Sequence, residues 1–225
     1  RTIVVMIGGS AIVTPWSDKV KALLMAWYPG QEGGEAVWDV ISGKVSPSGK
    51  LPVVFPMEES HTPYFDRNAK EITYDHYHGY RYLNKHGLKP RFAFGFGLSY
   101  TTFTITSPVL DWQKETQNGT LRLTVENIGK YDGAEVVQLY ASYDTGKIER
   151  PSFELKDFKR VELAIGQSRE VIFHLSARQF AYWRPETKDW FTPSGQYKFY
   201  VGTSGNADDL ISIDCAVVKD EFFTQ

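Results

Sequence analysis

Two continuous apolar runs lie near the start of the chain, at residues 3–7 and 22–28. A run without polar interruption is typical of a strand buried on both faces. Between residues 31 and 42 the pattern becomes helical, because four apolar residues fall on one stripe: Ala36, Val37, Val40 and Ile41. Gly43 follows where a helix commonly ends in a left-handed residue. With a short apolar run at residues 51–55, this pattern predicts an α/β unit.

From about residue 92 onward, apolar and polar residues alternate, as in half-buried strands. Four such strands are marked by their apolar positions: Leu121, Leu123 and Val125; Val171, Phe173 and Leu175; Tyr197, Phe199 and Val201; and Ile211, Ile213, Cys215 and Val217. Turn signals, among them Asn118-Gly119, separate the strands. About seven short strands at this spacing predict a β-sandwich of immunoglobulin or fibronectin type III kind. The chain has one cysteine, so no cysteine pair is present, which favours the fibronectin-like version.

The segment between these halves, from about residue 58 to residue 89, is rich in tyrosine, histidine and charge and shows no regular period. Long irregular segments in compact proteins are usually functional or packed against another surface. The fold class predicted is therefore α/β followed by an all-β sandwich. The expected division is residues 1–57, a connecting segment at 58–104, and the sandwich at 105–225.

Composition narrows the classes of function. The 25 Lys and Arg nearly balance the 27 Asp and Glu, and the formal net charge is −2. No basic run alternates with aromatic residues, so we expect no nucleic-acid partner. No apolar run reaches the ~20 residues of a membrane helix, so we expect no membrane partner, and the compartment stays open. Because the chain begins at Arg1 directly before a core strand, we expect it to be a piece of a longer protein.

Three carboxylates project from the predicted helix, at Glu32, Glu35 and Asp39. They have the residue type for acid/base chemistry. The alternative is that they form a solvated face and match the helix dipole, since Glu32 and Glu35 lie in the first turns. The second interpretation is the one we adopt.

Asp75, His76 and His78 form a second candidate site, because alternate positions of an extended segment face the same side. Metal binding, hydrogen bonding to a sugar or a neighbouring domain, and a structural role are the alternatives. No second cluster offers further ligands at a recognisable spacing, so no metal is predicted. The glycine-rich loops at residues 8–10 and 29–34 lack a phosphate or dinucleotide fingerprint, so no cofactor is predicted. Trp16, in a loop after the first strand, is a candidate for stacking on a sugar.

Several longer motifs resemble the family 3 glycoside hydrolases, the β-glucosidase and β-xylosidase group. They cover nearly the whole chain in order: Trp27-Tyr-Pro-Gly-Gln-Glu-Gly-Gly34, Ser46-Pro-Ser-Gly-Lys-Leu-Pro-Val-Val-Phe-Pro56, Gly79-Tyr-Arg-Tyr82, Phe94-Gly-Phe-Gly-Leu-Ser-Tyr-Thr-Thr-Phe103, Val125–Tyr140, Glu154-Leu-Lys-Asp-Phe158 and Pro193-Ser-Gly-Gln-Tyr197. One departure is Tyr74-Asp-His-Tyr-His78, which lacks the Glu-Gly pair that relatives often carry before Gly-Tyr-Arg.

The resemblance implies that residues 1–57 are the end of an α/β sandwich domain and residues 105–225 a fibronectin type III-like domain. It also implies a retaining β-glycosidase, most simply a β-glucosidase, acting on terminal β-linked sugars. Its Asp nucleophile, on a barrel domain, and its Glu acid/base would precede residue 1, so this chain is expected to carry no catalytic carboxylate and to be inactive alone. Trp16, His76 and His78 are expected at the substrate rim or the barrel contact. A non-catalytic carbohydrate-binding or scaffold protein is the alternative, and a homodimer is left open.

Overall fold

The computed structural model describes residues 2–144, 146 and 148–223, without the side chains of residues 214 and 215. The predicted alternation places Cys215 in a core strand, and its side chain lies outside this description. Most of the ordered structure is β-sheet, with few helices. None of the described helices is both long and apolar enough to cross a lipid bilayer.

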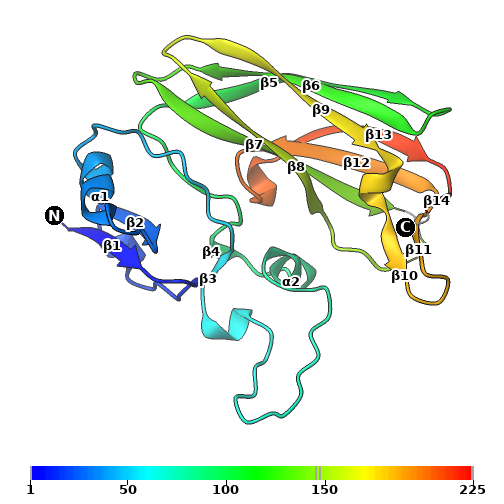
Figure 1. Ribbon diagram of the computed structural model, residues 1–225, viewed down its shortest axis with the longest axis horizontal. Coiled ribbons are helices and arrows are strands. Elements are labelled where there is room, and N and C mark those ends of the chain that lie inside the picture. Colours follow the sequence, from blue (N-terminus) through cyan, green and yellow to red (C-terminus); the bar gives the residue numbers. More distant parts are fainter. Residues whose placement is uncertain (1, 145, 147, 224–225) are drawn as a thin grey trace.

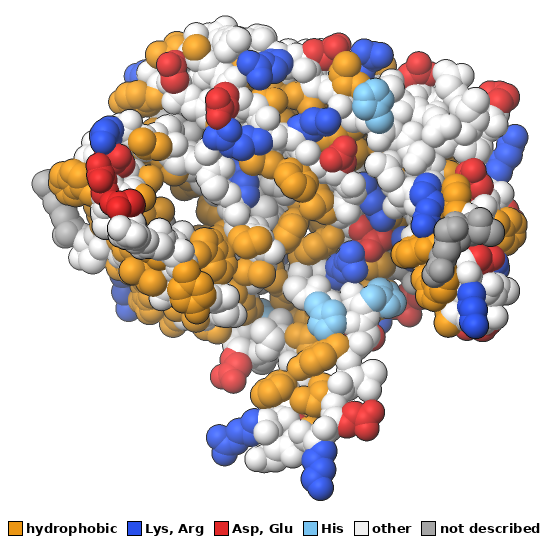
Figure 2. All heavy atoms as spheres, in the orientation of Figure 1, with side chains coloured by type: hydrophobic (Ala, Val, Ile, Leu, Met, Phe, Trp, Pro, Cys, Tyr) orange, Lys and Arg blue, Asp and Glu red, His pale blue; other side chains and the backbone are white. Residues whose placement is uncertain are grey.

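The first part of the chain contains the predicted parallel strands and helix. Its elements are β1 (Ile3–Ile7), the 3-10 turn η1 (Ser17–Lys19), β2 (Ala22–Trp27) and α1 (Gly33–Ile41). β1 and β2 pair in parallel with each other. The expectation that the first strand is buried on both faces is wrong for this chain, since Ile3 and Ile7 are 50% and 67% exposed. The reason is that this sheet has only two strands, and hydrophobic side chains remain visible over it (Figure 2).

Helix α1 confirms the helical pattern, although it begins at Gly33 rather than near residue 31. The Pro29 ring packs on Gly33, where an added Cβ would lie 2.6 Å from Pro29 Cγ. Gly43 has φ +81° and donates its N–H to the Val40 carbonyl at 3.1 Å, which confirms the predicted helix end.

The middle of the chain contains more regular secondary structure than its sequence indicates. It contains β3 (Phe55–Pro56), η2 (Glu59–His61), α2 (Tyr80–Lys85) and β4 (Pro90–Phe92), and β3 pairs with β4. The predicted strand at residues 51–55 is wrong except at its end. Leu51 instead exchanges backbone hydrogen bonds with Gly95 and Phe96, both at 2.8 Å, and Pro52 has no N–H to extend this pairing. Between η2 and α2 the chain projects as a long loop (Figure 1).

The second half is the predicted β-sandwich (Figure 1). One sheet has the order β5-β6-β9 and the other the order β13-β12-β7-β8. The strand bounds are β5 (Phe103–Gln113), β6 (Asn118–Asn127), β7 (Gly133–Asp144), β8 (Glu154–Leu163), β9 (Ser168–Ser176), β12 (Gly195–Gly202) and β13 (Ile211–Val218). The alternating apolar residues predicted for β6, β9 and β12 are all at most 3% exposed and face one another in a single core.

Two local predictions in the sandwich are wrong for identifiable reasons. Asn118-Gly119 is not a turn but the start of β6, and Gly119 is needed there because a Cβ would lie 2.5 Å from the Asp111 carbonyl oxygen. In β13 the predicted alternation fails because the register shifts between Ile213 and Cys215. After that bulge the buried positions are Ala216 and Val218, and Val217 is 45% exposed.

A small three-stranded sheet closes one end of the sandwich. It has the order β10-β11-β14, with bounds Tyr182–Arg184, Asp189–Thr192 and Glu221–Phe223. The remaining 3-10 turns are η3 (Ala177–Phe180) and η4 (Ala207–Asp209).

Candidate functional site

The histidine segment, defined as residues 74–78, lies directly before α2 in the projecting part of the chain. His76 and His78 are exposed, whereas Tyr77 between them is only 5% exposed. The His76 ring lies against the Tyr77 ring, with centroids 4.3 Å apart, and the outer parts of both histidines remain exposed. The His78 ring is also packed edge-on against Tyr74, with centroids 5.2 Å apart.

Tyr77 is held in place by a carboxylate and an ammonium group. Its hydroxyl donates to Glu149 Oε1 at 2.9 Å, and the Lys85 ammonium lies 2.8 Å from the same oxygen. The Lys85 Nζ also sits 3.8 Å from the centre of the Tyr77 ring. Burial and the bond to Glu149 raise the pKa of Tyr77, and the hydrogen bonds from Lys85 and Tyr77 lower the pKa of Glu149.

Helix α2 is joined to the sandwich by its first two residues. The Tyr80 hydroxyl accepts a hydrogen bond from the Leu155 backbone N–H at 3.1 Å. The Tyr80 ring stacks on Phe153, with centroids 6.0 Å apart. Arg81 Nη2 lies 2.9 Å from Glu154 Oε1. The motif at residues 79–82 therefore contacts the motif that begins at Glu154.

Glu154 is buried at the start of β8 and has three cationic partners. Besides Arg81, its carboxylate contacts Arg150 Nη2 at 2.9 Å and Lys156 Nζ at 3.4 Å. Burial alone would raise the pKa of Glu154, but the charge of Lys156 and the bond from Arg150 outweigh it and bring it to about 2. Burial lowers the pKa of Lys156 to about 8, because it disfavours the charged amine more than Glu154 favours it.

A second set of contacts joins the first part of the chain to the sandwich. Lys50 donates to the Gly97 carbonyl at 2.8 Å and pairs with the buried Glu135 at 2.6 Å. Ser46 and Ser99 share a hydrogen bond at 2.9 Å. Gly97 lies so close to residue 49 that a Cβ would meet the Gly49 carbonyl oxygen at 2.2 Å. The polar groups of these motifs therefore join the first part of the chain to the sandwich.

Trp16 is half-buried and immediately precedes η1. Arg91 from β4 holds that turn through Ser17 Oγ at 2.7 Å and Asp18 Oδ2 at 2.6 Å. In the described part of the chain, Trp16 makes no ring contact with either histidine of the histidine segment. Their shared role at the substrate rim therefore stays a prediction.

The helix carboxylates have ordinary surroundings. Glu32 and Glu35 are exposed, and Asp39 pairs with Lys44 at 3.0 Å. Within residues 2–144, 146 and 148–223, no group of three or more His, Cys, Asp or Glu could hold a metal ion.

The sequence did not predict the two residues that anchor α2, Glu149 and Glu154. The only signal for Glu154 was its place at the start of a motif, and Glu149 carried none.

The chain is similar in sequence to two known domain families and to several characterised glycosidases. Residues 1–100 match the Glycosyl hydrolase family 3 C-terminal domain, and residues 135–205 match the Fibronectin type III-like domain. Thermostable beta-glucosidase B of Acetivibrio thermocellus is 39% identical over 209 residues, which cover 90% of this chain and 28% of that protein. An exo-alpha-(1->6)-L-arabinopyranosidase of Bifidobacterium breve is 39% identical over 210 residues, with coverage of 91% and 28%.

Solved structures agree with the sequence comparison. β-Glucosidase 3B from Thermotoga neapolitana, in complex with alpha-D-glucose, superposes with a TM-score of 0.90 at 32% identity. The match covers 99% of this chain and 32% of that chain. The chain thus spans about 28% of the length of the curated relatives it matches.

Proposed function

This chain belongs to glycoside hydrolase family 3, and we propose that it is the C-terminal part of a retaining β-glycosidase, most simply a β-glucosidase. The protein that carries it would release terminal β-linked sugars from glycosides or oligosaccharides. In retaining enzymes two carboxyl groups about 5–5.5 Å apart act as nucleophile and acid/base. We place both outside this chain, in the part of the relatives that it does not span.

The proposed division follows from that assignment. Residues 1–57 form the C-terminal part of an α/β sandwich domain, residues 58–104 a connecting segment, and residues 105–225 the fibronectin type III-like domain. The exposed apolar side chains of β1, such as Ile3 and Ile7, support the first element, because a strand of an α/β sandwich is covered by further strands and helices.

Within the enzyme, the function of this chain is to position side chains at the rim of the substrate site. The observation that carries the idea is the double anchoring of α2, through Glu149 and Glu154, which fixes the position of His76 and His78 relative to the sandwich. Both histidines would then face the barrel domain or its sugar, and Trp16 would face the same partner from the loop after β1.

The test compares two proteins on an aryl β-glucoside. The 225-residue chain should fold and show no hydrolysis, whereas the complete protein that includes it should release the aryl group with retention at the anomeric carbon. A folded complete protein that hydrolyses none of a panel of aryl β-glycosides would overturn the enzyme assignment and favour the scaffold alternative. Hydrolysis by the chain alone would overturn the placement of the catalytic carboxylates outside it.

A further inference from the structure

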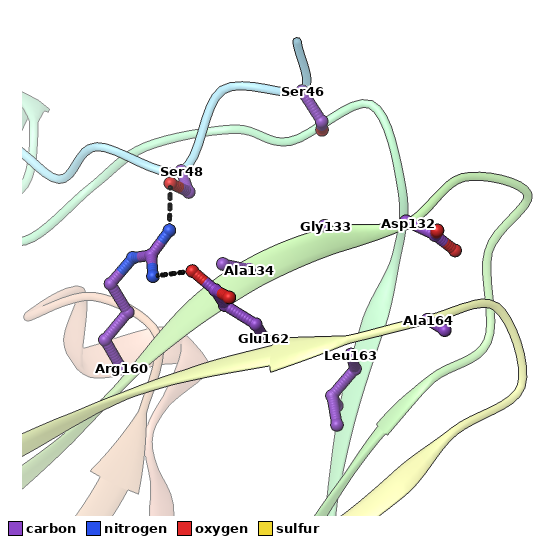
Figure 3. A pocket seen from close by; sticks show the side chains of 9 residues that line it. All are labelled: Ser46, Ser48, Asp132, Gly133, Ala134, Arg160, Glu162, Leu163 and Ala164. Atoms are coloured by element: carbon purple, nitrogen blue, oxygen red, sulfur yellow. Dashed lines mark hydrogen bonds and ion pairs between the residues drawn. The ribbon is translucent and has the colours of Figure 1, made fainter.

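A shallow cleft lies between the loop at residues 46–48 and the outer face of β7 and β8 (Figure 3). Its volume is about 400 Å³, within the range of small-ligand sites. The loop contributes the hydroxyls of Ser46 and Ser48, and the strands and their connections contribute Arg160, Glu162 and Asp132. None of these groups takes part in the anchoring of α2.

The polar groups of this cleft are already ordered without a ligand. Arg160 Nη2 donates to Ser48 Oγ at 3.3 Å, and Nη1 pairs with Glu162 Oε1. Asp132 Oδ1 accepts from the Ile165 backbone N–H at 3.0 Å. The Arg160 and Glu162 side chains are still 49% and 72% exposed, so N–H donors and carboxylate lone pairs remain open to a ligand.

The net charge of the cleft restricts the chemical class of ligand that it can bind. The lining contains one guanidinium, Arg160, and two carboxylates, Asp132 and Glu162, so it carries a formal charge of −1. A phosphate, sulfate or uronate would meet net repulsion. The alternation of donors, acceptors and hydroxyls instead suits a neutral molecule with several neighbouring hydroxyl groups.

An exposed aromatic ring lies beside these polar groups. Phe158 is 61% exposed and belongs to the same face of β8 as Arg160 and Glu162, because the three occupy alternate positions of the strand. Phe158 is one alternate position from Arg160, a distance of about 7 Å along the strand. An aromatic face of this kind can stack on the apolar C–H face of a pyranose, while Arg160 and Glu162 reach its hydroxyls.

We propose that this cleft and Phe158 form an accessory binding site for a neutral pyranose unit of an oligosaccharide. Both walls are fixed beforehand, since Ser46 is tied to Ser99 and β8 is paired along its length with β7. Pre-formed walls reduce the ordering cost of binding. The site needs neither the catalytic carboxylates nor the barrel, so it would bind sugar in the isolated chain.

Saturation-transfer NMR and calorimetry on the 225-residue chain test the site with cellobiose, laminaribiose and xylobiose, and with inorganic phosphate as the anionic probe. We expect at least one disaccharide to bind in the millimolar range and phosphate not to compete. Phe158→Ala and Arg160→Met should each weaken binding about tenfold or more. The matched controls are Phe222→Ala and Arg122→Met, whose side chains are similarly exposed elsewhere.

Melting curves of all four variants distinguish a loss of sugar binding from a loss of the folded structure. If both cleft variants unfold, the milder changes Phe158→Leu and Arg160→Lys replace them. Absence of binding by every disaccharide, equal binding by the cleft variants and the wild type, or displacement of the sugar by phosphate would each overturn the proposal. Because this assay involves no hydrolysis, its failure leaves the proposed enzyme function untouched, and an inactive complete protein leaves this site untouched.

Discussion

Arg81 on α2 and Glu154 at the start of β8 form an ion pair, with Nη2 2.9 Å from Oε1. Together with the bond from Leu155 N–H to the Tyr80 hydroxyl, this contact joins the connecting segment to the sandwich. A helix of six residues has little stability of its own, so its position depends on such tertiary contacts. The orientation of the histidine segment before it depends on them in turn.

The first prediction concerns the charge of Glu154. The substitution Glu154→Gln removes the only carboxylate described among Arg81, Arg150 and Lys156, which leaves two largely buried cations, Arg150 and Lys156, without a counter-charge. We expect a loss of roughly 3 kcal/mol in the free energy of unfolding, measured by urea denaturation. Glu170→Gln is the control, because its pair with Arg122 is exposed and should be worth no more than about 0.5 kcal/mol. Equal stability of the two variants would contradict this role.

The second prediction is a dependence of stability on pH. The pKa of Glu154 is lowered from 4.5 to about 2 in the folded chain, so the stabilisation is complete above pH 4.5 and is lost as the pH falls toward 2. By linkage it amounts to up to roughly 3 kcal/mol. Urea denaturation at a series of acidic pH values should show a steeper loss for the wild type than for Glu154→Gln. Parallel curves would show that Glu154 does not titrate with folding.

Lys156 leads to a third prediction, with the same sign in a higher pH range. Its pKa is lowered from 10.5 to about 8 by burial, so between these values the unfolded chain binds more protons and stability rises with pH. Lys156→Met removes this dependence and, at neutral pH, should leave the free energy of unfolding unchanged or raise it, because the buried charge is gone while two arginines still pair with Glu154. A loss as large as that of Glu154→Gln would mean that Lys156 is an essential partner.

Much of the fold could be predicted from periodicity, because strands such as β6 and β12 have one face in a single core. What could not be predicted depends on long-range contacts. The bulge in β13 reverses the faces at Ala216 and Val217, and α2 follows a glycine, Gly79, with φ +54° in a segment without periodic apolar residues. Likewise, the sequence around Glu154 does not distinguish it from other carboxylates on strands, because its partner Arg81 is brought beside it only by the fold.

The candidate rim could be predicted only in part for the same reason. Alternation along the chain indicated that His76 and His78 share a side, and both are exposed in the structure. It could not indicate that Tyr77 between them binds Glu149, a partner far along the sequence. Nor could it indicate where Trp16 lies relative to the histidines, which depends on the connection through Arg91.

The fourth prediction tests the histidines in the complete protein. The double change His76→Ala and His78→Ala should lower kcat/KM for an aryl β-glucoside about tenfold or more, if the two rings face the sugar or the barrel. The melting temperature of the 225-residue chain should not move, because both side chains are exposed. His174→Ala, an exposed histidine on β9, is the control and should leave both values unchanged. Unchanged activity and stability of the double variant in the complete protein would rule out the proposed rim.

The fifth prediction concerns Gly119, the residue that the sequence assigned to a turn. An alanine Cβ there would lie 2.5 Å from the Asp111 carbonyl oxygen and 2.8 Å from Cε3 of Trp112. Neither atom can move freely, since Asp111 belongs to β5 and the Trp112 indole donates to the Val217 carbonyl. We therefore expect Gly119→Ala to cost about 1–3 kcal/mol in the free energy of unfolding.

Gly34→Ala is its matched control. Gly34 lies in α1 with nothing within 4 Å of an added Cβ, so alanine should stabilise the helix by roughly 0.5–1 kcal/mol. Opposite signs for the two substitutions in thermal or urea denaturation would show that Gly119 is required by the close approach of β5. A Gly119→Ala chain as stable as the wild type would mean instead that β5 can move away, and that this glycine is tolerated rather than required.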